Sequence, residues 1–232
     1  MKKRLPNLGS IACCVGVLSF LMLSACEEPE TILAGKREPL RAEEASNTVV
    51  NTGLTDNRSE PVALSQAQSN ANWLQRHNSP HTRIDHPAFG GELEPIWSVN
   101  IGSGNSRFGR IVSEPVVLDG KVFTLDSEAR VSATSTAGAA LWNVSLVPER
   151  DSGRDATGGG LAASKGVVYA ASGFGVVSAL DAKTGQELWV QKLQASATGS
   201  PTVRDGIVYL VAGDSTAWAL NAESGRILWQ LG

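Results

Sequence analysis

The three histidines of the chain, His77, His81 and His86, fall within ten residues of one another, with Asp85 beside them. Imidazole nitrogens and a carboxylate at such short separations are the ligand types that bind zinc or copper. Against a metal centre, two prolines interrupt the stretch, and no regular element is predicted there that would fix the rings. We therefore predict no metal site, and the role of this histidine segment stays open.

Two glycine runs, 102–104 (Gly-Ser-Gly) and 158–160 (Gly-Gly-Gly), have the composition of phosphate-binding loops. Neither is followed by the Lys-Ser/Thr pair or the helix that a P-loop needs. We expect them instead to let neighbouring innermost strands approach closely, where a side chain would clash. No Gly-x-Ser-x-Gly elbow occurs in the sequence, and all histidines precede the repeats described below. The sequence predicts no catalytic residues, and the protein is not expected to be an enzyme.

The amino terminus carries the pattern of a secretion signal. Residues 2–4 are Lys-Lys-Arg, and residues 11–23 form an apolar run that is short for a membrane span. Residues 23–26, Leu-Ser-Ala-Cys, resemble the lipobox of bacterial lipoproteins. We predict that residues 1–25 are a signal peptide and that Cys26 is lipidated. An ordinary cleaved signal is the alternative, and it would leave an odd thiol in an oxidising compartment.

Cysteine usage and charge exclude further classes of protein. Cys13 and Cys14 lie in the apolar run, so the mature chain has no pair of thiols for a disulfide. The chain has 20 basic and 23 acidic residues and no basic stripe, which argues against nucleic acid as a partner. Residues 26–70 lack aromatic side chains and any strand or helix period, and they are predicted to be a lipidated flexible tether.

From residue 71 to residue 232 the sequence is organised by a repeat. Three stretches follow one pattern: Pro115–Trp142, Leu161–Trp189 and Pro201–Trp229. Their turn glycines, which lie 46 and 40 residues apart, are Gly120, Gly166 and Gly206. This period is typical of a propeller blade of four strands. We predict an all-β fold, a β-propeller, over residues 71–232.

Each repeat also predicts a second turn and an outer strand. The turn begins on an Asx residue and closes on glycine, as at Asp181 with Gly185 and at Asn221 with Gly225. A tryptophan follows, and four are predicted to open outer strands: Trp97, Trp142, Trp189 and Trp229. Because one blade cannot cover an indole alone, we expect each to pack on the next blade rather than to stack on a ligand.

These residues resemble a known family. Residues 179–189 fit the A-x-D-x-x-T-G-x-x-x-W repeat of PQQ-like propellers, and residues 219–229 fit it with Asn and Ser substituted for Asp and Thr. The copy that ends at Trp142 is one residue shorter and has no Asp. With the lipobox, Trp97–Arg107 and Gly158–Ala162, the chain resembles the BamB family, the propeller lipoproteins of the outer-membrane β-barrel assembly (BAM) machinery.

The resemblance implies an eight-bladed propeller without cofactor. Eight blades of about 40 to 45 residues exceed what residues 71–232 supply, so we expect a leading strand and about three blades of a partial propeller. Glu27, where inner-membrane lipoproteins often have Asp, implies an anchor at the periplasmic face of the outer membrane. The implied partners are the POTRA domains of BamA, other BAM subunits and unfolded outer-membrane proteins, and strand addition is one mode of contact.

Two alternatives share the repeat. One is a periplasmic binding or sensory propeller of another class. The other is a quinoprotein dehydrogenase, which the family resemblance associates with PQQ, calcium and a vicinal disulfide. Cys13 and Cys14 are vicinal, but they lie in the predicted signal peptide and cannot serve in the mature chain.

Overall fold

The structure is a computed structural model that describes residues 61, 63–79 and 86–232. Apart from Pro61, these residues belong to one compact unit, Val62–Gly232. The predicted signal peptide, Cys26, most of the predicted tether, His81 and Asp85 lie outside the described residues. In the described ranges, no helix has the length and apolar character needed to cross a lipid bilayer.

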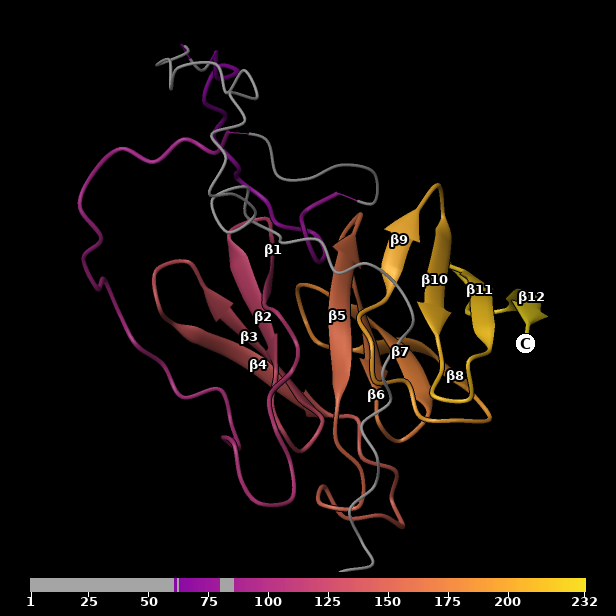
Figure 1. The fold of residues 1–232 in the computed structure, drawn as a ribbon. Helices are drawn as coiled ribbons and strands as arrows, with labels where there is room; N and C mark the ends of the chain where they lie inside the picture. Colours follow the sequence, from indigo (N-terminus) through magenta and orange to yellow (C-terminus); the bar gives the residue numbers. More distant parts are fainter. Residues whose placement is uncertain (1–60, 62, 80–85) are drawn as a thin grey trace, which may run out of the picture. The chain divides into compact units, whose positions relative to one another are not determined.

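In the part of the chain that the structure describes, twelve strands form three antiparallel sheets of four, each in chain order (Figure 1). The first sheet consists of β1 (Val116–Leu118), β2 (Lys121–Leu125), β3 (Arg130–Ser135) and β4 (Ala140–Ser145). The second consists of β5 (Gly159–Ser164), β6 (Val167–Ser172), β7 (Val176–Asp181) and β8 (Glu187–Lys192). The third consists of β9 (Thr202–Arg204), β10 (Ile207–Val211), β11 (Ala217–Asn221) and β12 (Ile227–Leu231). The predicted all-β fold of four-stranded blades is confirmed, with three blades in the described residues.

The hairpin between the first two strands of each blade is a two-residue turn. At Asp119 and Gly120 the φ angles are 49° and 71°, and at Asp205 and Gly206 they are 51° and 77°. Two consecutive positive φ angles define the type I′ turn, whose twist matches that of paired strands. In the second blade Lys165, at φ 49°, takes the place of the aspartate, so the blade imposes the turn on a residue with no preference for it.

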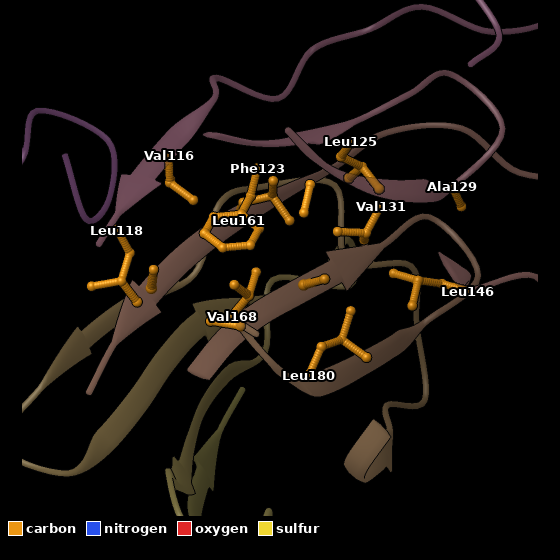
Figure 2. Packing of buried hydrophobic residues seen from close by; sticks show 14 residues of the cluster. Val116, Leu118, Phe123, Leu125, Ala129, Val131, Leu146, Leu161, Val168 and Leu180 are labelled. Carbon is orange, nitrogen blue, oxygen red and sulfur yellow. The ribbon is translucent and has the colours of Figure 1, made fainter. Parts of the chain in front are cut away.

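The core lies between successive blades rather than within one. Figure 2 shows the cluster that joins the first two sheets, in which Phe123 and Val131 pack with Leu161, Val168 and Leu180. A second cluster joins the second and third sheets through the opposite face of the second sheet. Strands β5 to β7 are therefore buried on both faces, which explains their nearly continuous runs of small and apolar residues.

The predicted leading strand at Trp97 is wrong. Residues 91–115 contain no strand, because no neighbouring chain among the described residues completes a ladder beside them. The other outer strands exist, but each begins two residues before its tryptophan, at Ala140, Glu187 and Ile227.

Candidate functional site

The tryptophan of one blade docks on the turn of the next blade. Trp142, on β4, donates its indole N–H to the carbonyl oxygen of Ala182 at 3.3 Å. A Cβ added to Gly185 would lie 2.8 Å from the same indole, so the ring lies directly against the turn backbone. The equivalent contacts join Trp97 to Thr136 and Gly138, and Trp189 to Ala222 and Gly225. Trp229, on β12, is 46% exposed.

The hairpin glycines hold the turns that receive these tryptophans. The carbonyl oxygen of Gly166 accepts the N–H of Ala182 at 2.9 Å, while the carbonyl of Ala182 accepts the Trp142 indole. Residue 182 is thus bonded to its own blade through one group and to the previous blade through the other. The same arrangement occurs at Thr136 with Gly120 and at Ala222 with Gly206.

An aromatic residue on the second strand supports each tryptophan from within its own blade. The ring centroids of Phe123 and Trp142 are 5.7 Å apart, and those of Tyr169 and Trp189 are 5.9 Å apart. The Tyr169 hydroxyl also donates to the carbonyl of Ala222 at 3.2 Å, and burial raises the pKa of this phenol. The indoles of Trp142 and Trp189 are therefore each held between an aromatic ring of their own blade and the backbone of the next.

The Asx residue closes the docking turn through one oxygen. Asp181 Oδ1 accepts the N–H of Lys183 at 3.0 Å and both the N–H and the hydroxyl of Thr184 at 2.8 Å. The hydroxyl and N–H of Thr184 hold the pKa of Asp181 below its usual 3.8. Asn221 makes the equivalent three bonds, two of them to Ser224, so the same turn also forms around an uncharged amide oxygen.

The first blade forms its docking turn by other means. Its sequence lacks the Asx residue, and the Ser135 hydroxyl instead accepts the N–H of Ala139 at 3.0 Å across a shorter turn. Gly138, which our sequence reasoning missed, provides the flat surface for Trp97. It could have been found by spacing, because it precedes Trp142 by the same four residues that separate the other turn glycines from their tryptophans.

A hollow of about 560 Å³ lies at the opposite end of the blades, where the chain crosses from one blade into the innermost strand of the next. We call this the crossing end. The hollow is lined by three crossing segments: residues 106–112 before β1, Thr157 and Gly158 before β5, and Thr198 before β9. The Thr157 hydroxyl accepts the N–H of Arg110 at 3.3 Å, which links the first two segments.

Two arginines give the crossing-end hollow its chemistry. The Arg107 guanidinium lies 5.7 Å from the ring centroid of the exposed Phe108. Neither Arg107 nor Arg110 forms an ion pair with any acid in the part of the chain that the structure describes. Unpaired guanidinium groups suit a carboxylate or phosphate group. The sequence showed no pattern that pointed to this site.

Of the two glycine runs, only the second reaches into an innermost strand, because residues 102–104 lie outside any strand. A Cβ added to Gly160, on β5, would overlap Ser200 immediately before β9. A Cβ on Gly102 would likewise overlap the carboxylate of Asp126. The contact at Gly160 agrees with the close approach expected from the sequence, whereas Gly102 meets a side chain and not a neighbouring strand.

Of the histidine segment, the structure describes His77 and His86. The His86 ring nitrogen Nδ1 lies 2.8 Å from the carbonyl oxygen of Ser65. Within the described ranges, no group of three or more His, Cys, Asp or Glu side chains is placed to hold a metal ion.

Comparison with known proteins gives the blades a family likeness. Residues 127–232 match the family model described as "Outer membrane protein assembly factor BamB". A quinohemoprotein alcohol dehydrogenase from Comamonas testosteroni is 33% identical over 117 residues, which are 48% of this chain and 16% of that enzyme. The described blades are therefore similar to PQQ-like propeller proteins over residues 127–232, and the chain spans about a sixth of the length of the enzyme that it matches.

Solved structures with similar folds include both kinds of protein. BamB from Moraxella catarrhalis has a TM-score of 0.45 at 22% identity, over 53% of this chain and 36% of that one. The Comamonas testosteroni dehydrogenase has a TM-score of 0.47 at 28% identity, over 53% of this chain and 21% of that one.

The docking geometry predicts unequal costs for two glycine substitutions. Gly185 and Gly206 both have φ 77°, so alanine carries the same backbone penalty at each. Only at Gly185 does the new Cβ meet an indole, whereas nothing lies within 4 Å at Gly206. We expect Gly185→Ala to lower the free energy of unfolding by about 1 to 3 kcal/mol more than Gly206→Ala, measured by urea denaturation. Equal losses would contradict tight docking of Trp142.

The turn chemistry predicts a pH effect at Asp181. Because folding lowers its pKa, its stabilising contribution is complete above the usual value of 3.8 and is lost as pH falls through the folded value. We expect Asp181→Asn to melt below the wild type at pH 7, and we expect this difference to shrink as pH falls below 3.8 and the carboxylate becomes protonated. Asn221→Asp should gain the same pH dependence. Parallel melting curves across this range would contradict the assignment.

Proposed function

We propose that this protein is a non-catalytic scaffold lipoprotein of the BAM complex, which assists the assembly and insertion of β-barrel proteins into the outer membrane. The observation that carries the proposal is the match of residues 127–232 to the BamB family model. The lipobox at residues 23–26 supports it, because a lipidated Cys26 would hold the propeller at the periplasmic face of the outer membrane.

The interlocked blades suit a scaffold. Each docking turn is bonded to two blades, so the crossing segments are carried on a base that resists deformation. We propose that Arg107 and Arg110 in the crossing-end hollow contact carboxylates on a POTRA domain of BamA. Charged groups of this kind steer association and set orientation more than they add affinity.

A second candidate is a quinoprotein dehydrogenase, which the 33% identity to the Comamonas testosteroni enzyme favours. Such an activity would need PQQ and calcium. The guanidinium groups of the crossing-end hollow fit the carboxylates of a quinone, but none of its nine lining residues is an Asp or Glu that would ligate calcium. The lining residues therefore do not fit PQQ together with calcium, and we derive no catalytic step through this cofactor and metal.

One experiment separates the two candidates. The full mature chain is used to capture the purified POTRA domains of BamA, and the same preparation is assayed with PQQ, calcium and a dye acceptor for alcohol oxidation. We expect capture without turnover. Turnover above background together with failure to capture BamA would replace the scaffold proposal with the enzyme.

The proposed contact at the crossing end predicts a selective loss of capture. Arg107→Ala with Arg110→Ala should weaken POTRA binding by about tenfold or more and reduce its salt dependence, because two charges are removed from the contact. Arg226→Ala, which removes an exposed arginine beside a docking turn, is the matched control and should bind as the wild type does. Equal weakening by both changes would point to a general charge effect instead.

The lipobox predicts the location of the protein. In Cys26→Ser the acceptor thiol is absent, so the protein should move from the membrane fraction to the soluble periplasmic fraction and lose palmitate labelling. Alanine at Cys13 is the control, since that position lies in the predicted signal peptide. A Cys26→Ser protein that stays membrane-bound and labelled would show that the anchor lies elsewhere.

A further inference from the structure

A short segment before the blades crosses the innermost strands at the end opposite the crossing-end hollow. We call residues 72–75 the N-terminal strap (purple in Figure 1). Trp73 exchanges two main-chain hydrogen bonds with Val117 on β1, of 2.8 and 2.7 Å. The next residue, Leu74, accepts the N–H of Ala163 on β5 at 2.6 Å. The strap therefore runs between the edges of two blades and is bonded to both.

The strap reaches the third blade through a side chain. Gln75 Oε1 accepts the N–H of Val203 on β9 at 2.9 Å, and Gln75 is only 5% exposed. Beyond it the chain reverses, with the N–H of Asn78 bonded to the carbonyl of Gln75 and with φ 60° at both His77 and Asn78. The side-chain amide of Gln75 therefore makes the bond to β9 that a main-chain carbonyl would make if the strap continued straight.

These contacts show which kind of ligand the free edges of the innermost strands can bind. Each innermost strand pairs with its hairpin partner on one side, and its other edge has main-chain groups that need hydrogen-bond partners. The strap supplies them from extended backbone, which any polypeptide can provide. It is an imperfect occupant, because it turns away before making a main-chain bond to β9, and because Trp73 and Leu74 are only half-buried.

We propose that the edges of β1, β5 and β9 near their hairpins form a binding site for an extended polypeptide, and that the N-terminal strap occupies this site in the free protein. A partner chain binds by exchange with the strap and, by continuing straight, pairs with β9 as well. Because the strap directly follows the predicted tether in sequence, exchange also frees the residues that join tether and propeller. This inference does not depend on the proposed BAM function.

The test uses the full mature chain and a fluorescein-labelled peptide of residues 70–76, NANWLQR, followed by fluorescence anisotropy. Trp73→Pro removes the N–H that the strap donates to Val117 and so weakens the strap. The attached strap competes with the peptide, so the apparent affinity of the protein for the peptide falls with the fraction of molecules whose site is free. A weaker strap leaves more sites free, and we expect this variant to bind the peptide about tenfold tighter or more. Arg76→Ala removes only the exposed ion pair with Glu114 and should bind as the wild type does.

A second peptide with proline in place of tryptophan lacks the same N–H and should not bind. If Trp73→Pro does not fold, as judged by circular dichroism, Gln75→Ala removes the buried side chain that bonds Val203, keeps the main-chain N–H groups of the strap, and should give a smaller change in the same direction. The proposal is overturned if the peptide fails to bind a folded strap variant, if it binds that variant and the wild type equally, or if the proline peptide binds as well.

Discussion

The rest of the structure depends on the main chain of one residue per blade, the residue after the start of each docking turn. In the second blade this is Ala182, whose N–H is bonded to the hairpin glycine of its own blade and whose C=O accepts an indole from the previous blade. The same residue position joins the neighbouring pairs at Thr136 and Ala222. Part of the surface of each docked indole is thereby covered by the next blade in the chain, so no such blade completes its own packing.

Because of this constraint, the two ends of the innermost strands have different roles. The docking turns and hairpins share one end, where the N-terminal strap also bonds β1 and β5. The crossing segments meet at the other end, and there the side chains of Arg107 and Arg110 have no acidic partner in the described part of the chain. Rigid packing at one end thus leaves the crossing end to present charge, as expected of loops on a firm scaffold.

Sequence reasoning succeeded where the determinants are local and periodic. The blade repeat, the Asp119 hairpin and the Asx turn at Asp181 each follow from a few adjacent residues, and their fold was predicted correctly. It failed where partners are distant. Gln75 bonds Val203, which lies 128 residues later, and the residues next to Gln75 in the sequence contain no pattern that predicts this bond. The expected strand at Trp97 needed a ladder neighbour that local sequence cannot supply, while lipidation of Cys26 lies outside the described residues and stays a prediction.

Hydrogen exchange measured by mass spectrometry after Trp142→Leu tests the mutual dependence of the blades most directly. The substitution lies in the first blade, but the account assigns the indole to residues 182–185 of the second. Faster exchange should therefore appear in peptides covering that turn as well as in β4, while the equivalent turn at residues 222–225 keeps its protection. Faster exchange confined to the first blade would contradict the claim that each blade is completed by the next.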